Sequence, residues 1–322
     1  MSADSLWLDD RYRGRHGIAR YAQEVLSRMK TPLRPMGLGG KPASPTDAFR
    51  RLPVGPCDTL YSPGYAGFVS RSRQILTVHD LIHLHADWPA RARYLAYYDS
   101  VVKPAVRRAG VVLTVSESSR SDIQKWVGRG VEVINTGNGC ADVFTPGPQP
   151  STAAPYVLFI GNARPHKNFR VLLSAMAIDS SLRVRAVVPT GEVDTLAGRA
   201  HAAGVGVDRL EFLSGIDDDR LLELYRDAAV TAIPSTLEGF GLPALESVMC
   251  GTPVAYWIGC RSVAEIVGDR GYRVESAENA EEWAATLARA LAARERVTPP
   301  ARSLWDWQTV AERIDDAVAR YA

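Results

Sequence analysis

Two glutamates, Glu238 and Glu246, flank a glycine-containing turn in a pattern that suits a hydroxyl-rich or anionic ligand. Pro243, which follows the turn, is well suited to the first position of a helix. Glycines let the backbone approach a ligand closely, and free N–H groups at a helix start attract anions. Carboxylates accept hydrogen bonds from sugar or ribose hydroxyls. The segment therefore predicts a site for a diphosphate or a sugar, although a first-turn helix residue and a solvated loop charge would also explain the two glutamates.

A loop with two permanent cations and a histidine follows another apolar run. The run Tyr156–Ile160 predicts a buried strand, and the loop Gly161–Asn168 after it contains Arg164, His166 and Lys167. Arginine and lysine are the residues that stabilise a departing nucleotide diphosphate. From the residues alone, an ordinary exposed basic loop is the simpler interpretation.

A third candidate, His79-Asp80, stands at the end of the apolar run Ile75–Val78 in the first half of the chain. A lone histidine is more often structural, but the carboxyl end of a buried strand is also where ligands bind, so both roles stay open. His83 and His85 follow on the same loop without a clear carboxylate geometry, which does not favour a metal site.

The acidic run Asp217–Asp219 contains the Asp-x-Asp pattern of metal-dependent sugar transferases. It directly precedes the apolar positions of a predicted helix, where an aspartate is a common cap. The run is therefore predicted to cap a helix and not to bind a metal. The chain also lacks a Gly-x-Gly-x-x-Gly after a strand, a Walker loop and a Gly-x-Ser-x-Gly elbow, which disfavours nicotinamide, ATP and serine-hydrolase chemistry.

The elements that must position these residues alternate along the chain, which predicts an α/β fold with parallel sheets. In such sheets, ligands bind at the carboxyl ends of the strands. Strands are predicted over residues 5–8, 75–78, 111–115, 131–134, 156–160, 184–188, 210–213, 230–234 and 254–258. Helices are predicted over residues 18–29, 94–108 with an interruption at Pro104, 117–126 capped by Ser116, 169–177, 195–203, 218–228, 243–250, 280–293 and 307–321.

The bulk properties indicate a two-domain soluble protein. The chain has 322 residues, with 46% hydrophobic and 23% charged residues, and a proline-rich stretch over 145–155 forms a natural linker. We find no membrane-spanning stretch and no signal peptide, and the four scattered cysteines fit a reducing cytoplasm.

Charge is distributed unevenly along the chain. Residues 1–148 contain 20 Lys+Arg and 13 Asp+Glu, a net charge of +7, whereas the remainder contains 18 and 23, a net charge of −5. Ordinary variation of surface charge is one explanation. The other is that the arginines at positions 11, 13, 15 and 20 face an anionic membrane surface or an acceptor phosphate.

Taken together, these motifs resemble family 4 of the retaining glycosyltransferases, which have the two-Rossmann GT-B fold. Glu238–Glu246 is similar to the Glu-x7-Glu signature of that family, and Gly161–Asn168 to its phosphate loop. Thr77–Leu81 is similar to its donor-facing histidine segment, and Arg15–Tyr21 to its N-terminal glycine loop. The segments 114–117 and 138–139 match lesser landmarks, so the resemblance runs almost end to end.

The resemblance implies a domain plan and a set of roles. It implies Rossmann-like domains over 1–148 and 149–302 whose parallel sheets face a central cleft, and a C-terminal helix within 303–322 that packs back on the first domain. His79, Glu238 and Lys167 would be catalytic. Donor-binding residues would be Gly17, Asn162, Arg164, Lys167, Glu238, Gly239, Phe240, Gly241, Leu242 and Glu246. Among these, Lys167 and Arg164 would bind the diphosphate, Glu246 the ribose, and Glu238 the transferred sugar.

The resemblance also implies the reaction. The enzyme would transfer a sugar from a nucleotide-sugar donor, GDP-mannose before a UDP-sugar, to a glycan, lipid-linked or natural-product acceptor, with retention of configuration and without a metal or other cofactor. His166 and Asn162 depart from the family pattern, in which arginine is common at both places. A sugar-nucleotide epimerase, a phosphorylase and a non-catalytic sugar-nucleotide-binding protein are the alternatives.

Overall fold

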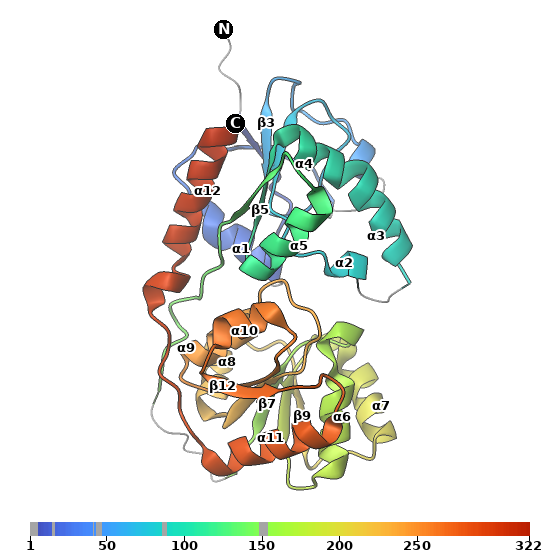
Figure 1. Ribbon diagram of the computed structural model, residues 1–322, viewed down its shortest axis with the longest axis vertical. Helices are drawn as coiled ribbons and strands as arrows, with labels where there is room; N and C mark the ends of the chain where they lie inside the picture. The colour runs from blue at the N-terminus through green and yellow to red at the C-terminus, as the bar shows by residue number, and fades with distance from the viewer. Residues whose placement is uncertain (1–5, 15–16, 41, 43–46, 86–88, 148–153) are drawn as a thin grey trace. The chain divides into compact units, whose positions relative to one another are not determined.

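The structure is a computed structural model, and it describes the chain except for residues 1–5, 15–16, 41, 43–46, 86–88 and 148–153. Its contacts divide the chain into two compact units, one of residues 1–139 with 303–322 and one of residues 140–302 (Figure 1). Each unit is an α/β structure in which every strand pair is parallel. The predicted α/β class with parallel sheets is confirmed. Each unit is described by itself below.

The first unit contains a four-stranded sheet in the order β2-β1-β3-β4 and a separate pair, β5-β6. The bounds are β1 Leu6–Leu8, β2 Arg34–Pro35, β3 Thr59–Ser62, β4 Arg73–Leu76, β5 Val111–Thr114 and β6 Glu132–Asn135. A single bridge between Thr77 and Leu113 joins the two sheets, and the N–H of Val78 donates to the Leu113 carbonyl at 2.8 Å. The buried run Ile75–Val78 therefore begins as a strand and ends as this bridge.

The predicted helices of the first unit are present, with two differences: the short helix Ile82–His85 stands where a loop was predicted, and the interruption at Pro104 has an unexpected form. Their bounds are α1 Gly17–Leu26, α2 Ile82–His85, α3 Arg91–Tyr97, α4 Lys103–Ala109, α5 Glu117–Val127 and α12 Trp307–Tyr321. The predicted interruption at Pro104 takes the form of a π-helical turn, Tyr98–Val102, between α3 and α4. Pro104 then falls in the first turn of α4, directly after the π-helical turn, which adjusts the helical hydrogen bonding next to a residue without an N–H. Ser116 caps α5 as predicted, because its hydroxyl accepts from the N–H of Ser119 at 3.0 Å.

The second unit contains a six-stranded sheet in the order β12-β11-β10-β7-β8-β9. The bounds are β7 Val157–Ile160, β8 Val184–Val187, β9 Leu210–Leu213, β10 Val230–Ile233, β11 Val254–Trp257 and β12 Gly271–Val274. Counted within the unit, this is the order 3-2-1-4-5-6 of a dinucleotide-binding fold read from the opposite edge. Strands β8 and β9 extend the sheet on one side of β7, and the chain then crosses to the other side of β7 to form β10. The point at which the order reverses therefore lies between β7 and β10.

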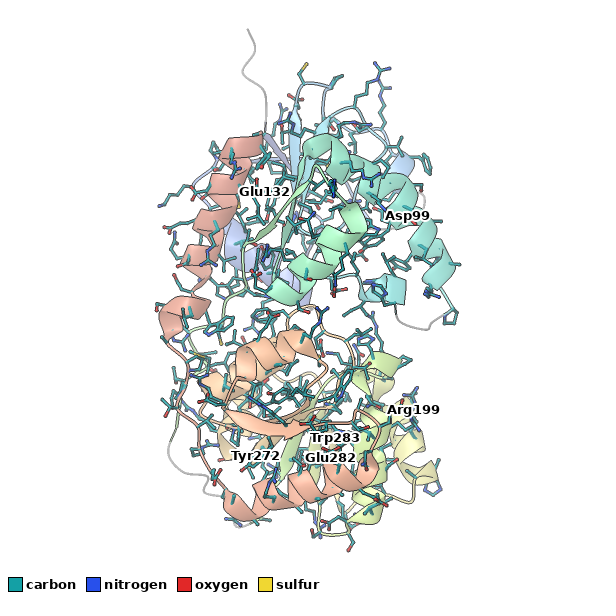
Figure 2. The ribbon with its side chains drawn as sticks, in the orientation of Figure 1. Asp99, Glu132, Arg199, Tyr272, Glu282 and Trp283 are labelled. Atoms are coloured by element: carbon teal, nitrogen blue, oxygen red, sulfur yellow. The ribbon has the colours of Figure 1, made fainter. Side chains whose placement is uncertain are left out.

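The helices that cover this sheet bury an apolar core of mostly aliphatic side chains. Their bounds are α6 Phe169–Ile178, α7 Val193–Ala202, α8 Asp218–Asp227, α9 Leu242–Met249, α10 Arg261–Val267 and α11 Ala280–Ala293. Trp283 on α11 is fully buried in this core, and α11 packs against α6 (Figure 2). Asp217 accepts the N–H of Arg220 at 2.9 Å and caps α8, which confirms the predicted helix cap. Sequence analysis did not find α10 or β12.

The C-terminal helix α12 belongs to the first unit and packs against α1. Its contact with the loop after β6 is close: a Cβ added at Gly139 would lie 2.4 Å from the Trp307 ring. Asp315 holds the helix at a second place, because its carboxylate accepts the N–H groups of Lys30 and Thr31 at 2.8 and 3.0 Å. Glycine at position 139 is therefore required by packing.

We expect Gly139→Ala to destabilise the first unit by about 1–3 kcal/mol, the usual cost of overpacking a tight contact. Gly198→Ala is the matched control, because Gly198 lies exposed within α7 and an added Cβ meets nothing within 4 Å. That control should stabilise the second unit by about 0.5–1 kcal/mol through helix propensity. Denaturant unfolding of the full chain checks both, and an unchanged Gly139→Ala protein would contradict the described packing.

Candidate functional site

The structure brings two of the predicted loops together at the reversal point of the second sheet. β7 and β10 are adjacent and parallel, so their carboxyl ends meet at the same edge of the sheet. The loop after β7 contains Lys167, and the loop after β10 contains Glu238. The Nζ of Lys167 lies 2.6 Å from Oε1 of Glu238. The predicted catalytic lysine and glutamate therefore form one ion pair, at the place where α/β sheets of this order bind ligands.

Backbone contacts hold the two loops independently of this ion pair. The N–H of Thr236 donates to the carbonyl of His166 at 2.8 Å. On the other side, the hydroxyl of Ser262 in α10 donates to the carbonyl of Glu238 at 2.9 Å. Because these bonds fix the main chain on both sides of the pair, Lys167 and Glu238 are presented on a rigid frame.

The electrostatics of the pair favour an ionised glutamate. Burial raises the pKa of Glu238, but the charge and hydrogen bond of Lys167 act in the opposite direction and outweigh it. Hydrogen bonding from Ser235 and the charge of His166 add to the lowering, so the pKa of Glu238 lies below its ordinary value of 4.5. The side chains of Lys167 and Glu238 are 15% and 11% exposed, which leaves both within reach of a ligand.

The glycine turn after Glu238 has the strained geometry that only glycine adopts easily. Gly241 has φ of +109°, and a Cβ there would lie 3.1 Å from Cγ2 of Val263. The helix α9 begins at the next residue, Leu242. Within the described part of the chain, the N–H groups of Gly241 and Leu242 have no hydrogen-bond partner. Two backbone donors at a helix start are thus available for an anionic oxygen.

Glu246, the predicted ribose ligand, lies one turn into α9. Its side chain is buried, with the residue 5% exposed, and its Oε2 accepts a hydrogen bond from the hydroxyl of Tyr225 at 2.8 Å. Tyr225 comes from α8, a neighbouring helix. The structure therefore places Glu246 within α9, with one carboxylate oxygen held by Tyr225. Its role in binding ribose stays a prediction.

Hydrogen bonds fix the main chain of the loop Gly161–Asn168, while the side chain of Arg164 is exposed. The N–H of Ala163 donates to Oε2 of Glu192 at 2.5 Å, and Arg199 donates to the Ala163 carbonyl at 3.0 Å. Asn162 accepts the N–H of Arg164 at 3.2 Å. The Arg164 side chain is exposed and has no ion-pair partner among the residues that the structure describes. It is available for an anion, as its predicted role requires.

His79 and Gly17 lie in the first unit. His79 is 8% exposed, its Nε2 lies 2.9 Å from the carbonyl of Pro63, and its ring packs edge-on against Tyr21 at 4.7 Å. A protonated Nε2 that donates to Pro63 fixes the orientation of the ring. Gly17 is the exposed first residue of α1. These contacts give His79 a defined structural environment and leave the predicted donor contacts of both residues as predictions.

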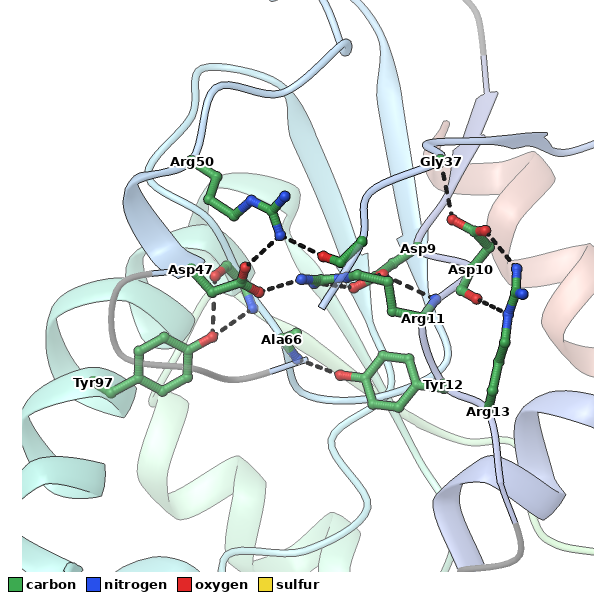
Figure 3. A network of polar contacts seen from close by, with 12 residues as sticks. Asp9, Asp10, Arg11, Tyr12, Arg13, Gly37, Asp47, Arg50, Ala66 and Tyr97 are labelled. Carbon is green, nitrogen blue, oxygen red and sulfur yellow. Dashed lines mark hydrogen bonds and ion pairs between the residues drawn. The ribbon is translucent and has the colours of Figure 1, made fainter. Parts of the chain in front are cut away.

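The prediction that Arg11 faces a membrane or a phosphate is wrong. Arg11 is buried between Asp9 and Asp47 and pairs with both carboxylates, which raises its pKa and keeps it charged (Figure 3). Arg13 is exposed but pairs with Asp10 at 2.9 Å. Arg15 lies outside the described residues. The buried Arg11 is paired with two buried carboxylates, and a count of charges along the chain does not reveal such pairing.

Sequence reasoning missed three polar residues of the site, namely Ser235, Ser262 and Tyr225. Ser235 follows the strand β10 after one residue, Pro234, so its place at the carboxyl end of a strand could have identified it. Ser262 and Tyr225 reach the site from α10 and α8, and no local pattern marks them. Within the described ranges, no group of three or more His, Cys, Asp or Glu could hold a metal ion, and no helix is both long and apolar enough to cross a membrane.

The order of the second sheet, 3-2-1-4-5-6 with its reversal between β7 and β10, is that of a Rossmann-like unit. Sequence comparison gives the family: residues 146–301 match the glycosyl transferases group 1 family. The second unit of this chain belongs to that family.

Two curated relatives are similar to part of the chain. An O-antigen chain mannosyltransferase B from Escherichia coli is 29% identical over 217 residues, which are 62% of this chain and 56% of the relative. A D-inositol 3-phosphate glycosyltransferase from Mycolicibacterium smegmatis is 33% identical over 210 residues, which are 60% of this chain and 47% of the relative. The chain thus spans about half the length of the curated relatives that it matches.

Solved structures extend the likeness of fold to nearly the whole chain. A sucrose-phosphate synthase from Thermosynechococcus elongatus superimposes with a TM-score of 0.73 at 19% identity and covers 99% of this chain and 96% of its own. WaaG, a glycosyltransferase involved in lipopolysaccharide biosynthesis, gives 0.62 at 14% identity, with 98% and 95% covered. HepE from Anabaena, solved with UDP and glucose, gives 0.62 at 20% identity over 82% and 78%. The chain therefore has the GT-B fold.

The Lys167–Glu238 pair predicts a pH dependence of stability. Because folding lowers the pKa of Glu238 below 4.5, the pair stabilises the fold fully above that pH, and the contribution is lost as the pH falls through the lowered value. The wild-type protein should exceed Glu238→Gln in free energy of unfolding at pH 7, and the difference should shrink well below pH 4.5. Glu211→Gln, which breaks an exposed pair with Arg185, should change little at either pH. A difference that grows on acidification would contradict the assignment.

Proposed function

We propose that this chain transfers a sugar from a nucleotide-sugar donor to a hydroxyl acceptor, with retention of configuration and without a metal or other cofactor. The ion pair between Lys167 and Glu238 at the reversal point of the second sheet carries this proposal. It combines a cation for a diphosphate with an ionised acceptor for sugar hydroxyls, on loops that backbone hydrogen bonds hold in place.

The roles follow from what each group offers. Lys167 and the exposed Arg164 bind the donor diphosphate, assisted by the backbone donors of Gly241 and Leu242 and the polar side chain of Asn162. Glu238, with the main chain of the turn through Gly239 and Phe240, accepts the hydroxyls of the transferred sugar. Glu246 binds the ribose, while His79 and Gly17 of the first unit contact the sugar and the phosphates or acceptor.

The mechanism that suits these residues is front-face substitution. The bond between the anomeric carbon and the diphosphate oxygen breaks while the acceptor oxygen attacks the same face, and the departing phosphate takes the acceptor proton. The contribution of the protein is then mainly electrostatic, because cations and N–H groups stabilise the charge that develops on the diphosphate. Such a step requires no protein base and no metal. Retention is the stereochemical consequence.

The donor and acceptor classes are supported only by the names of similar proteins. The name of an O-antigen mannosyltransferase among the relatives supports a mannosyl donor, for which we propose GDP-mannose, and the structure of HepE with UDP-glucose supports a UDP-sugar as the second candidate. A glycan or lipid-linked acceptor is consistent with the O-antigen and lipopolysaccharide names, and a natural-product acceptor remains an alternative.

We expect Lys167→Ala and Glu238→Ala each to lower transfer by about 100-fold or more while the protein stays folded, because each removes a charge at the reacting centre. The donor is first identified by thermal shift with GDP-, UDP-, ADP- and dTDP-sugars. Arg170→Ala is the matched control, since Arg170 is a nearby cation that is 78% exposed. It should transfer like the wild-type protein.

Near-wild-type turnover in Lys167→Ala or Glu238→Ala would refute the site assignment. A wild-type protein that binds a donor without turnover would instead be a sugar-nucleotide-binding protein. NMR of the anomeric proton in the product tests retention, and turnover that disappears with a chelator and returns with a divalent cation would refute metal independence.

We further propose that the first unit contacts an anionic membrane surface through an apolar and basic patch. Phe49 and Val69 are 75% and 58% exposed, and the N–H of Val69 donates to the carbonyl of Ala48 at 2.7 Å, which joins their segments. Arg108 donates to the carbonyl of Ser70 beside them. The exposed arginines at positions 50, 51, 71 and 108 flank the two apolar side chains. Apolar tips with basic neighbours are suited to the interface of anionic lipid.

The double variant Phe49→Asp/Val69→Asp should lose most co-sedimentation with vesicles that contain phosphatidylglycerol, because it removes apolar contact and adds repulsion. Val207→Asp is the control, since Val207 is 96% exposed on the second unit. Wild-type binding should weaken in high salt and with phosphatidylcholine alone. Binding that depends on neither salt nor lipid charge would overturn this proposal.

A further inference from the structure

The buried hydroxyl of Tyr225 holds one oxygen of the Glu246 carboxylate. Tyr225 is fully buried on α8, and its hydroxyl donates to Oε2 of Glu246 on α9 at 2.8 Å. An ionised carboxylate only accepts hydrogen bonds and has about four lone-pair positions. Tyr225 occupies one of them.

Tyr225 is itself held on several sides. The hydroxyl of Thr252 donates to the backbone carbonyl of Tyr225 at 2.5 Å, and Arg296 donates to that same hydroxyl oxygen at 2.7 Å. Phe144 packs edge-on against the Tyr225 ring, with ring centroids 5.8 Å apart. The phenol therefore cannot follow a rotating carboxylate and acts as a fixed reference point.

The phenol also stays a donor at every pH at which the protein is handled. Burial raises the pKa of Tyr225 well above 10, and the charge of Glu246 raises it further. The terminal torsion of a glutamate is broad when nothing restrains it. A permanent donor on one oxygen restrains this torsion and favours the orientation that keeps the hydrogen bond.

We propose that Tyr225 is a positioning residue, which orients the Glu246 carboxylate for the ribose hydroxyls of the donor nucleotide and so sets donor affinity without affecting the transfer step. This inference rests on the proposed function, because it needs Glu246 to bind ribose. Loss of the hydroxyl should weaken binding by about three- to tenfold, the contribution of one hydrogen bond. The effect should appear in the KM for the donor, while kcat at saturating donor stays within about twofold.

The experiment is a comparison of ribose and 2′,3′-dideoxyribose forms of the nucleoside diphosphate that the donor panel identifies, by calorimetry on the full chain. The wild-type protein should prefer the ribose form. Tyr225→Phe should lose part of this preference, because one contact that orients Glu246 is gone, and its affinity for the dideoxy form should be unchanged.

Tyr156→Phe is the matched control. The hydroxyl of Tyr156 is buried and donates to the carbonyl of Leu224 at 2.8 Å, one residue before Tyr225 on the same helix. Both variants therefore remove one buried tyrosine hydroxyl from the same part of the core, but only one of them touches Glu246. Tyr156→Phe should keep the wild-type preference for ribose even where its free energy of unfolding falls as much as that of Tyr225→Phe.

A cycle with Glu246→Ala, which removes the acceptor, separates the positioning role from a structural one. If Tyr225 acts through Glu246, adding Tyr225→Phe to Glu246→Ala should lower ribose preference no further. Additive losses would overturn the inference, as would a Tyr225→Phe protein with the full wild-type preference. A wild-type protein that binds the nucleotide but shows no preference for ribose would refute the role of Glu246, and one that binds no nucleotide would refute the proposed function itself.

Discussion

The pairing of β7 with β10 is the constraint on which the rest of the second unit depends. Lys167 and Glu238 are 71 positions apart in the chain, yet their charged atoms meet at 2.6 Å because the strands before them are hydrogen-bonded neighbours. Only a sheet whose order reverses at this point leaves both following loops uncovered by a connecting helix. The glycine turn, the free N–H groups at the start of α9 and the Arg164 side chain all follow strands that end at this edge of the sheet.

The ion pair is better explained by chemistry than by stability. Two charges that are mostly withdrawn from water lose hydration energy that their mutual attraction only partly returns, so apolar residues of similar size would often serve the fold as well. The loops are in any case held by the bonds from Thr236 and Ser262 to backbone carbonyls. A partly exposed pair on an already rigid frame is therefore consistent with groups kept for a ligand.

Periodicity and local chemistry were enough to predict most of the fold, and tertiary contacts explain the rest. The strand before the phosphate loop, the caps at Ser116 and Asp217 and the helix after the glycine turn are local features, and the structure has them. The π turn before Pro104 was beyond the prediction, because hydrophobic periodicity does not report a local change in helical hydrogen bonding. Arg11 was misjudged because one of its two partners, Asp47, is distant in the chain. Tyr225 was missed for the same reason, since its hydroxyl meets Glu246 only once α8 lies beside α9.

The packing of Trp307 against Gly139 makes the first unit discontinuous in the chain, with residues 140–302 inserted between its two parts. During synthesis, the whole of the second unit emerges from the ribosome before the last helix of the first. The second unit can therefore complete its core while the first still exposes the apolar surface that α12 will cover. The unit that begins second in the chain is therefore the first whose residues are all synthesised.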